Sequence, residues 1–153
     1  MVEFRRTTKL DTIRLGCWLR PADAAEVHAL GLGSIEACFE SWKRSQFATT
    51  MLVQGEVAAC AGLVLEQVSA LVPRRAQVWL LTSIVVDTAP MAFHRGMKQL
   101  LAGCAAHTDF LWQHVDARYE SSLRWLARLG FVVHPPRPHG PHQLPFHLVT
   151  REF

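Results

Sequence analysis

The feature that most constrains the fold is an almost uninterrupted apolar run, QVWLLTSIVVD, at residues 77–87. A strand with one face in solvent alternates apolar and polar residues, whereas a strand buried on both faces does not. The run therefore predicts a central strand of a sheet. The elements around it indicate what covers that sheet.

Strands and helices are predicted to alternate along the chain. Apolar residues that recur every three or four positions, such as Ile35, Cys38 and Trp42, indicate helices. The expected helices are 23–31, 34–45, 90–104 and 120–130, and the expected strands are 12–18, 47–54, 57–67, 77–87, 109–117, 131–134 and 146–152. This order, β-α-α-β-β-β-α-β-α-β-β, predicts an α/β fold with a mixed sheet. Residues 135–145 carry five prolines and predict an exposed connection without regular structure.

Composition narrows the class of protein. A chain of 153 residues is expected to form a single domain, residues 1–153. Lysine and arginine are scattered and the net charge is only +3, which gives little support for nucleic-acid binding. Half of the residues are hydrophobic, which is compatible with a well-filled core or with a surface covered by a partner. The four cysteines form no CxxC pair and predict reduced thiols in a cytosolic product. No apolar run reaches the length of a membrane span.

The element order, together with SLRWLARLGFVV at residues 122–133, resembles the GNAT N-acetyltransferase superfamily over nearly the whole chain. This resemblance implies a GNAT-like mixed sheet. The C-terminal third is also similar to the small GNAT-like internal virion proteins of short-tailed bacteriophages. That narrower resemblance is carried by LWQHV at 111–115, by the apolar final strand, and by Ser122, Arg124, Trp125, Leu126, Gly130 and His134.

The resemblance also indicates where coenzyme A would bind. In the acetyltransferases a glycine-containing loop before a helix presents backbone N–H groups to the pyrophosphate. Counted back from the leucines at 100–101, the loop positions are Ala92, Arg95 and Met97. Neither glycine position holds glycine, and Gly96 is one residue out of register, so we expect no cofactor. The alternative is acetyl-coenzyme A, bound by Gly96 in a shifted loop with Arg95 and Lys98 on the phosphates.

No catalytic residue is assigned from the sequence. The tyrosine that often protonates the departing thiolate in the family corresponds to Leu126, and the asparagine that precedes it corresponds to Tyr119. The central strand carries no carboxylate or histidine before Asp87. Glu66, His114 and Asp116 could act as a base, although structural roles are expected for them.

Four histidines lie within fourteen residues, His134, His139, His142 and His147. A proline-rich connection offers no fixed geometry and no cysteine is near, so no metal site is expected. Trp125, His139 and His142 are instead expected at a protein interface, because interface cores favour aromatic anchors.

Two functions follow from the resemblance. The first is a phage virion-associated structural or assembly protein with a degenerate acetyltransferase fold and no enzymatic activity. It would bind portal, tail or internal head proteins in several copies that follow a ring's symmetry. It would lie in the virion, and in the host cytoplasm during assembly. The alternative is an acetyl-coenzyme A-dependent N-acetyltransferase acting on a small amine or a host protein.

Overall fold

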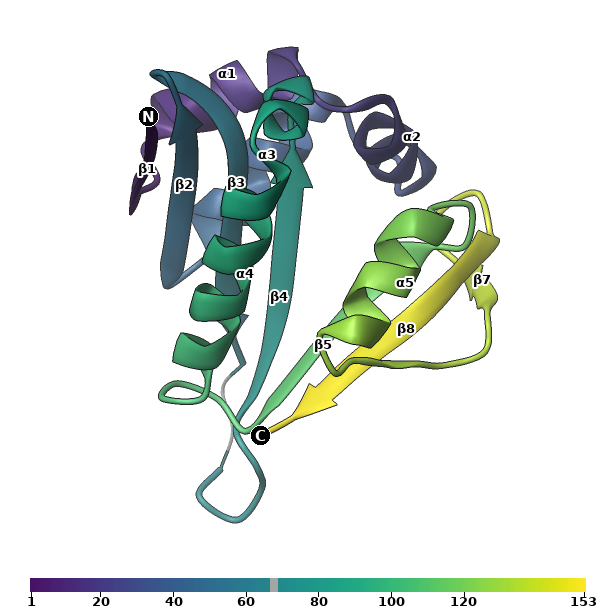
Figure 1. Ribbon diagram of the computed structural model, residues 1–153. Helices are drawn as coiled ribbons and strands as arrows, with labels where there is room; N and C mark the ends of the chain where they lie inside the picture. Colours follow the sequence, from purple (N-terminus) through teal and green to yellow (C-terminus); the bar gives the residue numbers. More distant parts are fainter. Residues whose placement is uncertain (67–68) are drawn as a thin grey trace.

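The computed structural model describes residues 1–66 and 69–153, and places one mixed sheet between two layers of helices (Figure 1). The strands are β1 (Val2–Arg6), β2 (Phe47–Val53), β3 (Glu56–Leu65), β4 (Arg75–Thr82), β5 (Phe110–Asp116), β6 (Val132–Val133), β7 (Arg137–His139) and β8 (Leu144–Glu152). The helices are α1 (Lys9–Cys17), α2 (Pro21–Ala29), α3 (Ser34–Arg44), α4 (Pro90–Cys104) and α5 (Glu120–Arg128), with a short 3-10 helix, η1, at Ile84–Thr88.

The strand order is β1-β2-β3-β4-β5-β8-β6, and β7 also pairs with β8. β4 and β5 are parallel, while the other neighbouring strands are antiparallel. The predicted α/β class with a mixed sheet is therefore confirmed.

Different helices cover the two faces of the sheet. α1, α2 and α3 pack on one face around Leu15 and Trp79. α4 and α5 pack on the other face, where Leu101 is buried. Successive side chains of β4 enter opposite layers, Leu81 with the first group of helices and Leu80 with η1 and α4. Because both faces are covered, this strand is apolar without alternation, as predicted.

The strand predicted at 12–18 is wrong, because this segment lies in α1 and its flanking residues. Thr8 and Asp11 form a capping box, in which each side chain accepts the backbone N–H of the other residue. Gly16 permits a close approach of α1 to α3, since a Cβ there would lie 2.5 Å from the Cα of Ile35. The first strand of the chain is instead β1, at the edge of the sheet.

Two other predicted strands differ at their C-terminal ends. The strand predicted at 57–67 corresponds to β3, and its last residue, Gln67, lies outside the described residues. The strand predicted at 77–87 corresponds to β4 but ends at Thr82. Ser83 ends it, because its hydroxyl caps η1 by accepting the N–H of Val85.

The proline-rich segment 135–145 is not irregular as predicted, because β7 pairs with β8 there. Prolines are tolerated in β7 because, within the described residues, β8 is its only neighbouring strand. The turn after β7 packs on the end of α2. Gly140 has a φ of +77°, which favours glycine, and a Cβ there would lie 3.1 Å from the carbonyl oxygen of Ala29. The ring of Pro141 lies close to Gly31. The segment is therefore held against the domain.

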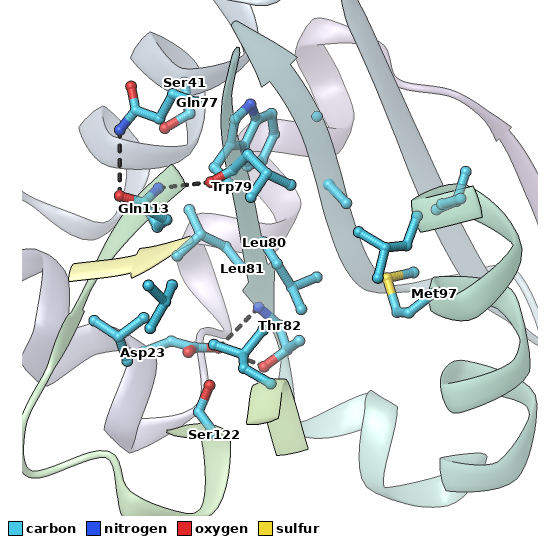
Figure 2. A pocket seen from close by; sticks show the side chains of 18 of the residues that line it. Asp23, Ser41, Gln77, Trp79, Leu80, Leu81, Thr82, Met97, Gln113 and Ser122 are labelled. Atoms are coloured by element: carbon cyan, nitrogen blue, oxygen red, sulfur yellow. Dashed lines mark hydrogen bonds between the residues drawn. The ribbon is translucent and has the colours of Figure 1, made fainter. Parts of the chain in front are cut away.

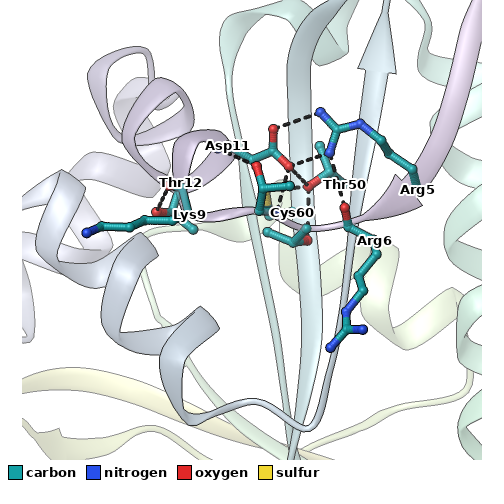
Figure 3. Close-up of polar contacts among 9 residues, drawn as sticks. Arg5, Arg6, Lys9, Asp11, Thr12, Thr50 and Cys60 are labelled. Atoms are coloured by element: carbon teal, nitrogen blue, oxygen red, sulfur yellow. Dashed lines mark hydrogen bonds and ion pairs between the residues drawn. The ribbon is translucent and has the colours of Figure 1, made fainter.

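A buried ionic cluster fixes the start of α1 to the sheet (Figure 3). Asp11 is almost completely buried, and its carboxylate accepts two hydrogen bonds from the Arg5 guanidinium, at 2.7 and 2.9 Å. It also accepts the Thr8 N–H at 2.8 Å and the Thr50 hydroxyl at 3.0 Å. Burial favours the neutral acid, but these hydrogen bonds outweigh it and lower the pKa of Asp11.

Two expectations from composition can be compared with the structure. In residues 1–66 and 69–153, no helix is both long and apolar enough to cross a membrane. The four cysteines carry free thiols, and all but Cys17 are buried.

Candidate functional site

β4 and β5 lie side by side for a short distance and then separate (Figure 1). The paired residues are Arg75, Ala76 and Gln77 of β4 with Phe110, Leu111 and Trp112 of β5. Beyond them, β4 continues along β3, and β5 continues along β8. The two strands therefore open a V in the middle of the sheet.

α2 crosses the wide end of this V and is bonded to both strands. Asp23 accepts the N–H of Thr82 at 2.8 Å, and also the hydroxyl of that residue, at the end of β4. Glu26 accepts the N–H of Asp116 at 2.9 Å, at the end of β5. The two carboxylates are three residues apart and so lie on one face of α2. One helix thus holds the ends of both strands.

The V forms part of a groove with a volume of about 750 Å³. Its lining includes Ala37 and Ser41 of α3, on one side of the sheet, and Phe93 and Met97 of α4, on the other. Figure 2 shows Ser41 and Met97 on either side of β4. The groove therefore extends through the sheet to both helical layers.

Glu26 has the electrostatic environment of a proton acceptor. Burial, together with the neighbouring carboxylates of Asp23 and Asp116, raises the pKa of Glu26 to about 7, although the hydrogen bond from Asp116 opposes this. Only one of its oxygens has a hydrogen-bond partner in the described parts of the chain. Burial and the Asp23 carboxylate raise the pKa of Tyr119, so its phenol stays protonated at neutral pH. A carboxyl group that titrates near neutrality suits proton transfer, and both Glu26 and Tyr119 line the groove.

The residues predicted to hold a phosphate do not line the groove. Arg95 and Lys98 are exposed on α4. Gly96 is buried on the same helix, and a Cβ there would collide with the ring of Phe4. Its role in the structure is to let β1 pack closely on α4.

Trp125, predicted at a protein interface, joins α5 to α4. Its indole N–H donates to Nδ1 of His94 at 3.0 Å, and its ring stacks on Phe93 with centroids 5.4 Å apart. All three residues line the groove. They connect the two helices on one face of the sheet.

The two predicted interface histidines lie near the turn between β7 and β8. The ring of His139 stacks on that of His114, with centroids 3.9 Å apart, and His142 is exposed. Burial and His139 lower the pKa of His114. No group of histidines, cysteines and carboxylates suited to a metal ion occurs in residues 1–66 and 69–153.

The other two bases considered from the sequence, Glu66 and Asp116, are engaged by neighbours. Glu66 accepts a hydrogen bond from Trp112 and forms an ion pair with Arg75. Asp116 is buried and accepts three hydrogen bonds from the Arg118 guanidinium. Burial acts to raise the pKa of Asp116, but the hydrogen bonds and charge of Arg118 have the larger effect and lower it, so the residue remains ionised.

Solved structures share this architecture over the whole chain. Ribosomal-protein-alanine N-acetyltransferase from Brucella melitensis has a TM-score of 0.76 at 10% identity, with 99% of each chain covered. YncA, a putative acetyltransferase from Salmonella typhimurium solved with its cofactor acetyl-CoA, has a TM-score of 0.68 at 11% identity, covering 99% of this chain and 93% of that one. The chain has the GNAT N-acetyltransferase fold. AAC(6')-Ib, in complex with ribostamycin and coenzyme A, has a TM-score of 0.70 at 12% identity, covering 99% and 93%.

Comparison of the sequence gives no such match. No family model matches the chain, and no curated protein is significantly similar in sequence. The GNAT fold therefore rests on structure.

The prediction of a phage virion protein without enzymatic activity is contradicted. The similar structures are acetyltransferases, two of them solved with acetyl-CoA or coenzyme A, and they favour the alternative, an acetyltransferase. The expectation of no cofactor likewise loses its support. The C-terminal residues that suggested a phage protein lie mostly on β5, α5 and β8.

Sequence reasoning missed the groups at the V: Asp23, Glu26, Thr82 and Gln113. Asp23 and Glu26 did carry a signal, because two acids three residues apart on a short helix share one face. Gln113 carried another, as an uncharged polar residue inside a largely apolar strand. Neither signal shows which distant residue the side chain will bond to.

Proposed function

We propose that the protein is an acetyl-coenzyme A-dependent N-acetyltransferase that acts on an amine. The observation that carries the proposal is the parting of β4 and β5, which opens the groove through the sheet beside Glu26. A groove open to both layers lets a donor and an acceptor enter from opposite sides and meet within the V. Similar structures solved with coenzyme A add support.

The residues at the V fit an acyl-pantetheine arm. Such an arm is extended and carries amide groups, so it can pair with a free strand edge as a peptide does. Backbone hydrogen bonding alternates along β4, and the carbonyl of Val78 and the N–H of Thr82 face the V. The N–H and C=O of Leu80 therefore face it as well. No side chain in the described residues is hydrogen-bonded to them.

The start of α4 offers a place for phosphate. α4 begins at Pro90, which lines the groove, and the next N–H groups, of Met91 and Ala92, lie in the first turn, where backbone donors lack helical partners. A helix N-terminus favours an anion even without a glycine-rich loop. The positions at which the sequence lacks the expected glycines lie inside α4, so a phosphate at the start of this helix would not require glycine there.

The bound cofactor would supply an acetyl thioester, whose C–S bond breaks as the C–N bond to the amine forms. The free oxygen of Glu26 takes the proton that the amine loses, and the Asp116 N–H holds the other oxygen in place. The Tyr119 phenol lines the groove and stays protonated, so it would donate a proton to the leaving thiolate. The N–H of Leu80, which faces the groove, would donate to the thioester carbonyl.

Release of free thiol from acetyl-coenzyme A, measured with a panel of primary amines, tests the proposal. We expect acceptor-dependent release that rises with pH through about 7 as Glu26 ionises. Glu26→Gln should lower kcat by about 100-fold or more and remove that rise. Glu120→Gln is the matched control, since Glu120 is exposed on α5 and does not line the groove. No amine-dependent release with any acceptor would refute the proposal.

A further inference from the structure

The side chain of Gln113 lies between β4 and β5, at the point where they part (Figure 2). It follows Trp112, the last residue of β5 that pairs with β4. Its Nε2 donates to the carbonyl of Val78 at 2.8 Å, and its Oε1 accepts the N–H of His114 at 2.7 Å. Gln77 also donates to Oε1, at 3.2 Å. One primary amide is thus bonded to the backbone of both strands.

These contacts take the place of the next bond of the parallel ladder. At the start of the pair, the N–H of Phe110 donates to the carbonyl of Arg74, and in a parallel ladder this pattern recurs every two residues. Two repeats further on, it would join the N–H of His114 directly to the carbonyl of Val78. The amide of Gln113 is inserted into that bond, so the strands there are separated by one additional amide group.

The inserted amide also determines whether the backbone N–H of Leu80 is hydrogen-bonded. In a continued ladder, the following bond would join the N–H of Leu80 to the carbonyl of His114. Because the strands are held apart, the N–H of Leu80 and the carbonyl of His114 face the groove instead. Two residues further along β4, the N–H of Thr82 is taken by Asp23. Leu80 therefore lies between Val78 and Thr82, whose backbone groups are hydrogen-bonded to side chains.

We infer that Gln113 is a positioning residue that interrupts the ladder and keeps the backbone of Leu80 free for a ligand. Its structural role is independent of the proposed function. Its effect on acetyl-coenzyme A rests on that function. The pairing of β4 and β5 would otherwise close the groove from its narrow end.

Amide hydrogen exchange tests the structural role in the free protein. In Gln113→Leu the N–H of His114 can bond to Val78 directly, and the next bond then covers Leu80. We expect exchange at Leu80 to slow by about tenfold or more, with a cooperative melting transition retained. Exchange at Leu80 that is unchanged in this variant would overturn the inference.

Calorimetric titration with acetyl-coenzyme A tests the consequence for binding. We expect the Kd of Gln113→Leu to rise about tenfold, and KM for acetyl-coenzyme A to rise while KM for the amine does not. Gln113→Glu keeps the acceptor for His114 but has no donor for Val78, and should give an intermediate Kd. Slower exchange with an unchanged Kd would overturn the positioning role. If the wild type binds no acetyl-coenzyme A, the proposed function fails, and exchange at Leu80 still decides the role of Gln113.

Discussion

Replacing Asp11 with alanine should lower the free energy of unfolding by about 3 kcal/mol, because it leaves a buried cluster without its acceptor. The carboxylate accepts bonds from Arg5, Thr8 and Thr50, and Asp11 is only 1% exposed. Loss of one partner of a buried pair costs about 3–5 kcal/mol. The Arg5 side chain is 35% exposed and can regain water, which places the effect at the lower end of that range.

Urea unfolding of Asp11→Ala and wild type measures this loss of unfolding free energy, provided that the two proteins have the same m-value. Asp109→Ala is the matched control, because Asp109 also pairs with an arginine, Arg74, but both side chains are about half exposed. The control should lose much less stability. Equal losses of unfolding free energy in the two variants would show that the burial of Asp11 does not add to its effect on stability.

The pKa of Asp11 is lowered by folding, so its contribution is present above the unfolded pKa of about 4 and is lost as pH falls through the folded value. The difference in stability between wild type and Asp11→Asn should therefore narrow below about pH 4.

Two further predictions concern single positions. Gly96→Ala should destabilise the protein by about 1–3 kcal/mol, because the new Cβ collides with Phe4. Gly103→Ala on the same helix meets open space and should stabilise the protein. Thermal unfolding distinguishes the two variants, and similar melting temperatures would contradict the close packing at Gly96. Glu26→Gln should melt above wild type at pH 8, because a raised folded pKa makes ionisation unfavourable to the fold, and the gap should close toward pH 4; equal melting temperatures at pH 8 would show that Glu26 is not desolvated.

Local patterns in the sequence were sufficient for most of the fold. The helix at 120–130 and its end at Gly130, which has a φ of +93°, follow from apolar spacing and the glycine stop. The strand predicted at 12–18 is wrong because Thr8 caps a helix just before this segment, and the β-like composition of the segment does not reveal that cap. Likewise, the run at 77–87 gave the position of a buried strand but not the cap at Ser83 that ends it.

The candidate site could not be read in the same way, because its bonds join distant parts of the chain. Asp23 reaches Thr82 across 59 residues, and Glu26 reaches Asp116 across 90. No local pattern carries that information. The missing glycines near Gly96 predict no cofactor, whereas the groove depends on where β4 and β5 separate.

The most direct test of the account is a titration with acetyl-coenzyme A followed by amide NMR of the whole protein. Binding within the V predicts saturable shifts at Leu80, Thr82 and His114. Glu26→Gln should bind similarly, because Glu26 is assigned to proton transfer. The account is contradicted if no shift occurs at millimolar acetyl-coenzyme A, or if the shifts are confined to the exposed face around Arg95 and Lys98.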